Sequence, residues 1–252
     1  MIGIFDSGSG GLTVLRAIRN EFPSVDVVYL GDIKNAPYGS RSREELSKLT
    51  ADGITYLLGQ GAGSIVSACN SVSASLAVSL LDVLEVAPSH LIEMVGPTVS
   101  YFRHATHRIL VAATPATIAS GIYQNAFRMI GKEIATVAIP NLAGAIEFGS
   151  SSEDIETIIT EALAPYRGTY NALIIACTHY PLVQAVFEKI AGSEVMVFDP
   201  AIAVAERVYK QLWPVEAGDG KTAFILTKEN RRFREFVSEL FPNEPYTIEV
   251  LE

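Results

Sequence analysis

Short apolar runs alternate along the chain with longer stretches in which apolar residues recur at the 3.6-residue period of a helix. The clearest helical periodicity covers Arg43–Gly59 and Glu153–Leu163. Continuous apolar strands separated by helices indicate an α/β fold with buried parallel sheets. The predicted strands are Ile2–Phe5, Val25–Leu30, Ser64–Ala68, Ile109–Ala113, Glu133–Ala138, Ala172–Ala176 and Glu194–Phe198.

Two of these strands end in the same way. Residues 64–71 and 173–179 both read as an apolar strand, an alanine, a cysteine and then polar residues. The two cysteines, Cys69 and Cys177, lie 108 residues apart, which is about the size of a small α/β domain. We therefore expect two similarly built, pseudo-symmetric lobes, each ending one strand with a cysteine.

Breaks in the pattern place the lobe boundaries. Gly96-Pro97 interrupts the regular elements, and a second crossing is expected after Asp199-Pro200. A last predicted strand, Tyr246–Val250, is then free to return to the first lobe. The expected division is residues 1–95 with 206–252 for the lobe of Cys69, and residues 96–205 for the lobe of Cys177.

Ligands of parallel α/β sheets bind outside the carboxyl ends of the strands, so the residues after each strand are the candidate site. Several of these segments carry small, polar or thiol side chains. They are Asp6-Ser7-Gly8-Ser9-Gly10-Gly11, Gly31-Asp32 with Pro37-Tyr38-Gly39, Cys69-Asn70-Ser71, Thr114-Pro115-Ala116-Thr117, Cys177-Thr178-His179 and Asp199-Pro200.

Two cysteines in 252 residues are too few for a disulfide framework, a four-cysteine zinc site or a CxxC redox pair. Read alone, each cysteine could be a small buried hydrophobe. Because each is expected where a strand gives way to a helix, the helix dipole should lower the thiol pKa.

Three chemical interpretations of the pair remain open. A disulfide is disfavoured in a reducing compartment. A Cys-His hydrolase could use Cys177 and His179, but side chains two residues apart in an extended segment diverge, and Cys69 stays unexplained. Two matched thiols also suit proton removal from one face of a carbon and its return to the other.

The chain carries a formal net charge of -9 and a pI near 5, which argues against nucleic-acid and anionic-membrane partners. Its start lacks the basic segment of a signal peptide, and no apolar run approaches the ~20 residues of a membrane span. We expect a cytoplasmic globular protein. An anionic ligand would have to be held by backbone amides and hydroxyls, because only Lys34 and Arg41 lie near these motifs.

Two cofactor interpretations are weak. Gly8-Ser9-Gly10-Gly11 with Asp32 resembles a dinucleotide fingerprint, but Thr13 stands at the third glycine position, so the glycines are expected to serve a tight turn. His104 and His107, on a predicted helix, have no further histidine or cysteine beside them, so we expect no metal. The sequence also offers no pyridoxal phosphate site.

Taken in order, the segments around Asp6, Asp32, Cys69, Thr114 and Cys177 identify a family. The chain resembles the glutamate racemases of the cofactor-independent aspartate/glutamate racemase superfamily essentially from end to end. This resemblance implies two flavodoxin-like αβα lobes, an active site in the cleft between them, a homodimer and supply of D-glutamate for bacterial peptidoglycan.

The resemblance also implies residue roles. Cys69 would deprotonate D-glutamate and Cys177 would deprotonate L-glutamate, with Asp6, His179 and Glu147 assisting. Glu147 read alone is a surface residue. The substrate would be bound by Asp6, Ser7, Pro37, Tyr38, Gly39, Cys69, Asn70, Ser71, Thr114, Thr117, Cys177, Thr178 and His179.

Some positions depart from the usual family pattern. Ala112-Ala113 precede Thr114 where a glycine is customary, Ser71 replaces a threonine, and Ala143-Gly144 replace Val-Pro. These changes concern the substrate pocket and leave both cysteines in place. The alternatives are a racemase of aspartate or another amino acid, and a non-catalytic homologue that binds an acidic ligand.

Overall fold

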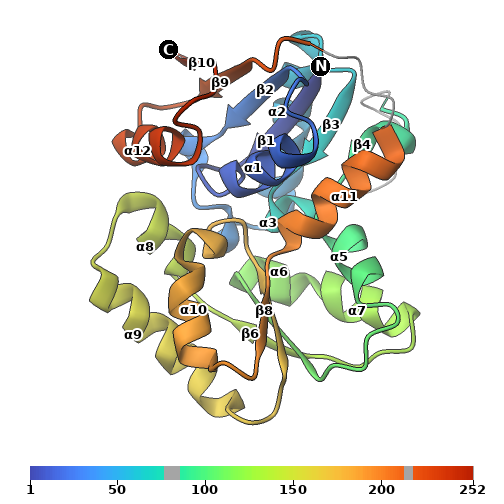
Figure 1. Cartoon of the computed structure of the whole chain (residues 1–252), viewed down its shortest axis with the longest axis vertical. Coiled ribbons are helices and arrows are strands. Elements are labelled where there is room, and N and C mark those ends of the chain that lie inside the picture. Colours follow the sequence, from blue (N-terminus) through green and yellow to red (C-terminus); the bar gives the residue numbers. More distant parts are fainter. Residues whose placement is uncertain (77–85, 213–217, 252) are drawn as a thin grey trace.

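The computed structural model describes residues 1–76, 86–212 and 218–251. It contains two β-sheets, one above the other in Figure 1, and every strand pair in both is parallel. The larger sheet has the order β10-β9-β2-β1-β3-β4 and the smaller one β6-β5-β7-β8. The α/β class with parallel sheets is therefore confirmed, and the two sheets fit two lobes.

The strands of the larger sheet come from both ends of the chain, which brings Tyr246–Val250 back beside the N-terminal strands as predicted. Two of its strands, β4 and β9, were not predicted. The strands are β1 (Ile2–Asp6), β2 (Val27–Gly31), β3 (Ser64–Ser67), β4 (Leu91–Ile92), β9 (Thr222–Leu226) and β10 (Tyr246–Val250).

The smaller sheet comes entirely from the middle of the chain. Its strands are β5 (Ile109–Ala113), β6 (Ala135–Ala138), β7 (Ala172–Ala176) and β8 (Met196–Phe198). Predicted starts at Glu133 and Glu194 are two residues too early, and so is the start at Val25 in the larger sheet. The division at residues 95 and 205 stays a prediction.

Strand register aligns the carboxyl ends where the candidate residues begin. Asp6 pairs with Gly31, and Phe5 pairs with Ser67, two residues before Cys69. In the other sheet Ala113 pairs with Ala176, one residue before Cys177. In each sheet, the loops that follow these strands therefore begin at the same edge. β1, β2, β5 and β7 are buried along their whole length, as their apolar sequences require.

Helices cover the sheets, and α11 packs on both α1 and α5, next to the second crossing between the sheets. Both predicted helices are found, and Ser42 and Glu45 form a capping box at the start of one. The helices are α1 (Leu12–Glu21), α2 (Arg43–Gly59), α3 (Asn70–Ser73), α5 (Val95–Tyr101), α6 (Pro115–Ser120), α7 (Ile122–Met129), α8 (Leu142–Phe148), α9 (Ser152–Leu163), α10 (Gln184–Ala191), α11 (Pro200–Leu212) and α12 (Arg231–Leu240).

Short 3-10 helices occupy several loops: η1 (Ile33–Asn35), η2 (Tyr38–Ser40), η3 (Pro88–His90), η4 (Ala164–Tyr166) and η5 (Tyr180–Val183). His104 and His107 lie after the end of α5, so the predicted helix at these residues is wrong. Nowhere in the described ranges is a helix long and apolar enough to cross a membrane.

Candidate active site

A small cavity lies where loops from the two sheets meet, and both cysteines line it. Its volume is about 10 Å³, room for roughly one water molecule. The site is therefore closed, and a ligand larger than a water molecule requires it to open. The lining residues are Ser7, Pro37, Tyr38, Gly39, Cys69, Asn70, Ser71, Thr114, Ala143, Cys177, Thr178 and His179.

A second cavity of about 550 Å³ shares Pro37, Gly39, Thr114 and Ala143 with the small one. Its wall includes Phe148, whose side chain is 61% exposed. This larger space therefore adjoins the closed site.

Cys69 follows β3 and is the N-cap residue of α3, as the sequence predicts. Its Sγ donates a hydrogen bond to Oγ of Ser7 at 3.8 Å. Burial, with the nearby charges of Asp6 and Cys177, raises the pKa of the Cys69 thiol to about 12, although the hydrogen bonds with Val72 and Ser7 lower it. The predicted lowering of this pKa is wrong for the closed site, because desolvation outweighs the one-turn helix.

Cys177 is followed by a turn and then by the 3-10 helix η5, so the predicted helix start at this residue is wrong. The turn brings Nδ1 of His179 to 4.0 Å from Sγ of Cys177. The expectation that these two side chains diverge is also wrong, because residues two apart share a face even in extended backbone and the turn after Cys177 brings them closer. Cys177 therefore has an imidazole beside it, whereas Cys69 has a hydroxyl.

His179 forms a buried ion pair with Glu147, with Nε2 at 2.6 Å from Oε2. Burial lowers the pKa of His179, but hydrogen bonds and charge from Cys177 and Glu147 raise it well above 6.5. Burial raises the pKa of Glu147, and the contacts with His179 and Ser9 more than offset this and lower it. Glu147 is only 1% exposed, so its interpretation as a surface residue is wrong.

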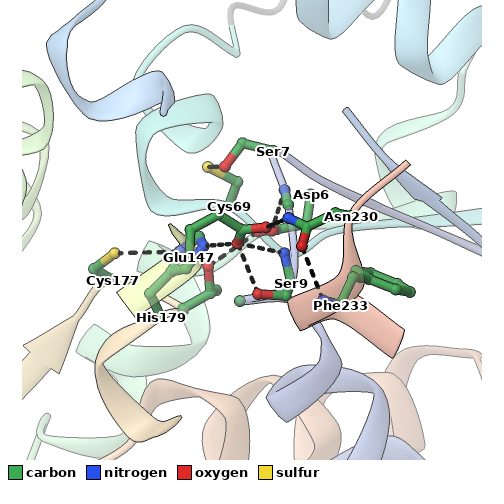
Figure 2. Close-up of polar contacts among 12 residues, drawn as sticks. Asp6, Ser7, Ser9, Cys69, Glu147, Cys177, His179, Asn230 and Phe233 are labelled. Atoms are coloured by element: carbon green, nitrogen blue, oxygen red, sulfur yellow. Dashed lines mark hydrogen bonds and ion pairs between the residues drawn. The ribbon is translucent and has the colours of Figure 1, made fainter. Parts of the chain in front are cut away.

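Ser9 anchors Glu147 from the other sheet: its backbone N–H and its hydroxyl donate to Oε2 at 2.9 and 2.7 Å (Figure 2). The neighbouring glycines allow this close approach. A Cβ at Gly8 would lie 2.6 Å from Oε2 of Glu147, and one at Gly10 would lie 2.5 Å from Oγ1 of Thr178. The glycines therefore serve contact between the two halves, and neither has a positive φ.

Asp6 lies just behind the cavity lining, fully buried. Its carboxylate accepts hydrogen bonds from the Gly8 N–H at 2.8 Å and the Thr178 hydroxyl at 3.0 Å. Burial raises the pKa of Asp6 to about 6, although the charge of His179 and these hydrogen bonds lower it. Asp6 thus joins the loop after β1 to the loop of Cys177, and its charge acts on Cys69.

Asp32 holds the loop that carries Tyr38. Its carboxylate accepts hydrogen bonds from the Tyr38 hydroxyl at 2.5 Å, the Thr227 hydroxyl at 2.8 Å and Nδ2 of Asn35 at 3.0 Å. Asp32 therefore supports the cavity wall and has its acceptors occupied, which leaves it no role like that of the ribose-binding acid in dinucleotide sites.

Asn70 offers a free donor at the cavity. Its Oδ1 accepts a hydrogen bond from the Tyr123 hydroxyl at 2.6 Å, which fixes the amide orientation. Nδ2 is buried and finds no acceptor among the residues that the structure describes. Sequence reasoning missed Tyr123, because a tyrosine inside α7 carries no strand-end signal.

We expect Tyr123→Phe to weaken substrate binding, because the Asn70 amide would lose the contact that orients it. KM should rise about tenfold, in the range of one hydrogen bond to a charged group, with a smaller change in kcat. Initial-rate kinetics at several substrate concentrations measure this split. An unchanged KM would contradict the role of Tyr123.

The hydroxyls at the start of α6 form a cluster with α3. Thr114 caps α6 by accepting from the Thr117 N–H at 3.3 Å, and its hydroxyl lies 3.1 Å from that of Ser71. Thr117 lies behind the lining and contacts both hydroxyls. The structure thus brings the sequence-predicted residues together, with Asp6, Thr117 and Glu147 one layer behind the cavity surface.

The described ranges hold no group of three or more His, Cys, Asp or Glu side chains placed to bind a metal ion. Instead, two buried thiols from two parallel sheets line one cavity, with hydroxyl and amide donors around them. That arrangement suits proton transfer to and from a carbon by two acid/base groups.

The chain belongs to the Asp/Glu/Hydantoin racemase family, whose sequence pattern matches residues 9–208. Glutamate racemase from Aquifex aeolicus is 37% identical over 208 residues, covering 81% of this chain and 80% of the relative. Glutamate racemase from Paracoccus denitrificans is 34% identical over 90% of both chains. The resemblance found in the sequence is therefore confirmed.

Solved structures agree with this. A glutamate racemase isoform from Bacillus anthracis has a TM-score of 0.89 at 26% identity, covering 100% of this chain and 97% of that one. Glutamate racemase from Francisella tularensis in complex with D-glutamate has a TM-score of 0.87 at 28% identity, with the same coverage. The similarity spans both sheets.

Proposed function

We propose that this protein interconverts L-glutamate and D-glutamate by a two-thiol mechanism. The observation that carries the proposal is the placement of Cys69 and Cys177 on one closed cavity, each at the end of a strand from a different sheet. The similarity to racemases named for glutamate, one of them in complex with D-glutamate, supports the substrate.

In the proposed reaction one cysteine, as thiolate, removes the α-proton, and the other, as thiol, donates a proton to the opposite face. Cys177 deprotonates L-glutamate and Cys69 deprotonates D-glutamate. The proton count balances, because each turnover leaves one thiol and one thiolate with exchanged positions. Excluding water from the cavity strengthens every charge interaction with the carbanion-like transition state.

The polar lining suits an anionic substrate without a cation. Nδ2 of Asn70 and the hydroxyls of Ser71 and Thr114 are donors for carboxylates, and Asp6 is an acceptor near the substrate ammonium. Binding an ammonium there also compensates the charge that raises the pKa of Cys69. The His179–Glu147 pair polarises Cys177 from behind.

The wider setting follows from the same resemblance. We propose that the protein works in the cytoplasm as a homodimer and supplies D-glutamate for peptidoglycan. No cofactor takes part in the proposed steps.

The test is incubation with L-glutamate in D₂O. We expect deuterium at Cα together with loss of optical rotation, at the same initial rate as from D-glutamate under subsaturating conditions, because the two enantiomers are equal in free energy. Exchange with aspartate or another amino acid but not with glutamate would reassign the substrate. No exchange with any amino acid would favour a non-catalytic homologue that binds an acidic ligand.

A further inference from the structure

Asn230 lies immediately before α12, in the part of the chain that joins β9 to β10, and it belongs to none of the strand-end segments that point to the site. Its Oδ1 accepts a hydrogen bond from the Phe233 N–H at 3.1 Å, which caps α12. Its Nδ2 donates to Oε1 of Glu147 at 2.8 Å (Figure 2). The side chain thus joins α12 directly to the buried ion pair.

The cap decides which way the amide points. A backbone N–H can donate only to the amide oxygen, so Oδ1 must face Phe233 and the NH₂ group must face Glu147. The orientation of Asn230 is therefore set by the helix and not by Glu147. The NH₂ group of Asn230 therefore faces the Glu147 carboxylate whether that carboxylate is charged or protonated.

The two oxygens of Glu147 have different partners. Oε2 accepts from His179 and from the N–H and hydroxyl of Ser9, whereas Oε1 accepts from Asn230. Without the second anchor, the carboxylate is free to rotate about its terminal torsion, which is soft. Rotation would change the direction of the hydrogen bond to His179, whose other nitrogen faces Cys177.

We propose that Asn230 is a positioning residue that fixes the rotation of the Glu147 carboxylate and thereby the ring of His179 against Cys177. The proposal rests on the proposed racemase function. In this proposal the start of α12 supports the proton transfer at Cys177. The support runs through α8, which carries Glu147 and packs against α12. Asn230 does not line the cavity, so its effect falls on the chemical step and not on substrate affinity.

The chain offers substitutions that separate this role from helix capping. In Asn230→Ser the hydroxyl still caps α12, because Ser and Asn are comparable N-caps, but it is too short to reach Glu147. In Asn230→Asp the cap also survives, and the second oxygen faces Oε1 of Glu147 as a like charge. A matched control is Ser151→Ala, which removes the N-cap of α9 on the exposed surface.

The experiment compares kcat, KM and melting temperature of the three variants with the wild type in the glutamate racemisation assay. We expect kcat to fall about tenfold in Asn230→Ser and about 100-fold in Asn230→Asp, with KM within about twofold of the wild type. Ser151→Ala should lower the melting temperature and leave kcat unchanged.

Wild-type kcat in folded Asn230→Ser, or equal losses of kcat in Asn230→Ser and Ser151→Ala, would overturn the positioning role. An increase in KM without loss of kcat would also overturn it, because it would place Asn230 in substrate binding. Failure of the racemase proposal is distinguished by the wild type, which would then racemise nothing in the same assay.

Discussion

Replacing either cysteine by alanine is expected to lower racemisation by on the order of 10⁴-fold, because each direction of the reaction needs one thiol to remove the proton and the other to return it. Cys69→Ala and Cys177→Ala should therefore lose racemisation to the same extent whether the substrate is L-glutamate or D-glutamate. Polarimetry and chiral chromatography of the product measure the loss. Any residual uptake of deuterium from D₂O should retain configuration, since only one face of the substrate then has a base.

The control for this pair is the folded state of the variants. Each truncation to alanine removes a single sulfur atom from the cavity lining and so leaves only a small void, and the melting temperature should change by a few degrees at most. Near-normal turnover in either variant would refute the two-thiol mechanism. Activity retained only in Cys69→Ala would point to chemistry by Cys177 and His179 alone.

Glu147→Gln is expected to lower kcat about 10- to 100-fold, in line with the loss of one hydrogen bond between charged groups. The amide keeps the shape of the carboxylate but removes the charge that keeps His179 protonated. The new side-chain amide also places its NH₂ group opposite another donor, either the NH₂ group of Asn230 or the backbone N–H of Ser9. Steady-state kinetics with glutamate check the prediction, and an unchanged kcat would contradict it.

The stability that Glu147→Gln loses relative to the wild type should depend on pH in a defined way. The raised pKa of His179 stabilises the fold fully below its ordinary value of 6.5, and this contribution is lost as the pH rises through the raised pKa. The lowered pKa of Glu147 stabilises the fold above 4.5, and this contribution is lost as the pH falls through the lowered pKa. The difference in melting temperature between wild type and Glu147→Gln should therefore be largest between pH 4.5 and 6.5 and smaller on both sides.

Strand-end reasoning located most of the site because parallel sheets collect the ends of their strands at one edge. Cys69, Thr114 and Cys177 follow buried apolar strands, so periodicity places each of them at a strand end, whereas their meeting in one cleft is implied only by the family resemblance. Tyr123 and Asn230 were not predictable in this way. One lies inside a helix and the other before a helix, and only packing between segments far apart in sequence gives them partners.

The electrostatic state of the site was also beyond the sequence. Position at a strand end suggested a lowered thiol pKa, but burial against Asp6 raises that of Cys69 to about 12. A glutamate with no motif of its own suggested a surface residue, but contacts from Ser9, His179 and Asn230 bury Glu147 as a carboxylate. Both outcomes depend on which groups exclude water from which others, and spacing along the chain does not carry that information.

By itself, therefore, the sequence determined the parallel α/β class, the paired cysteines and the family, because hydrophobic periodicity and short strand-end motifs are local properties. The tertiary structure decided that the cavity between the cysteines is closed, that the glycines near Ser9 serve close contact, and that α12 reaches the ion pair behind Cys177. These features arise where two sheets meet, and such contacts are fixed by three-dimensional packing and desolvation.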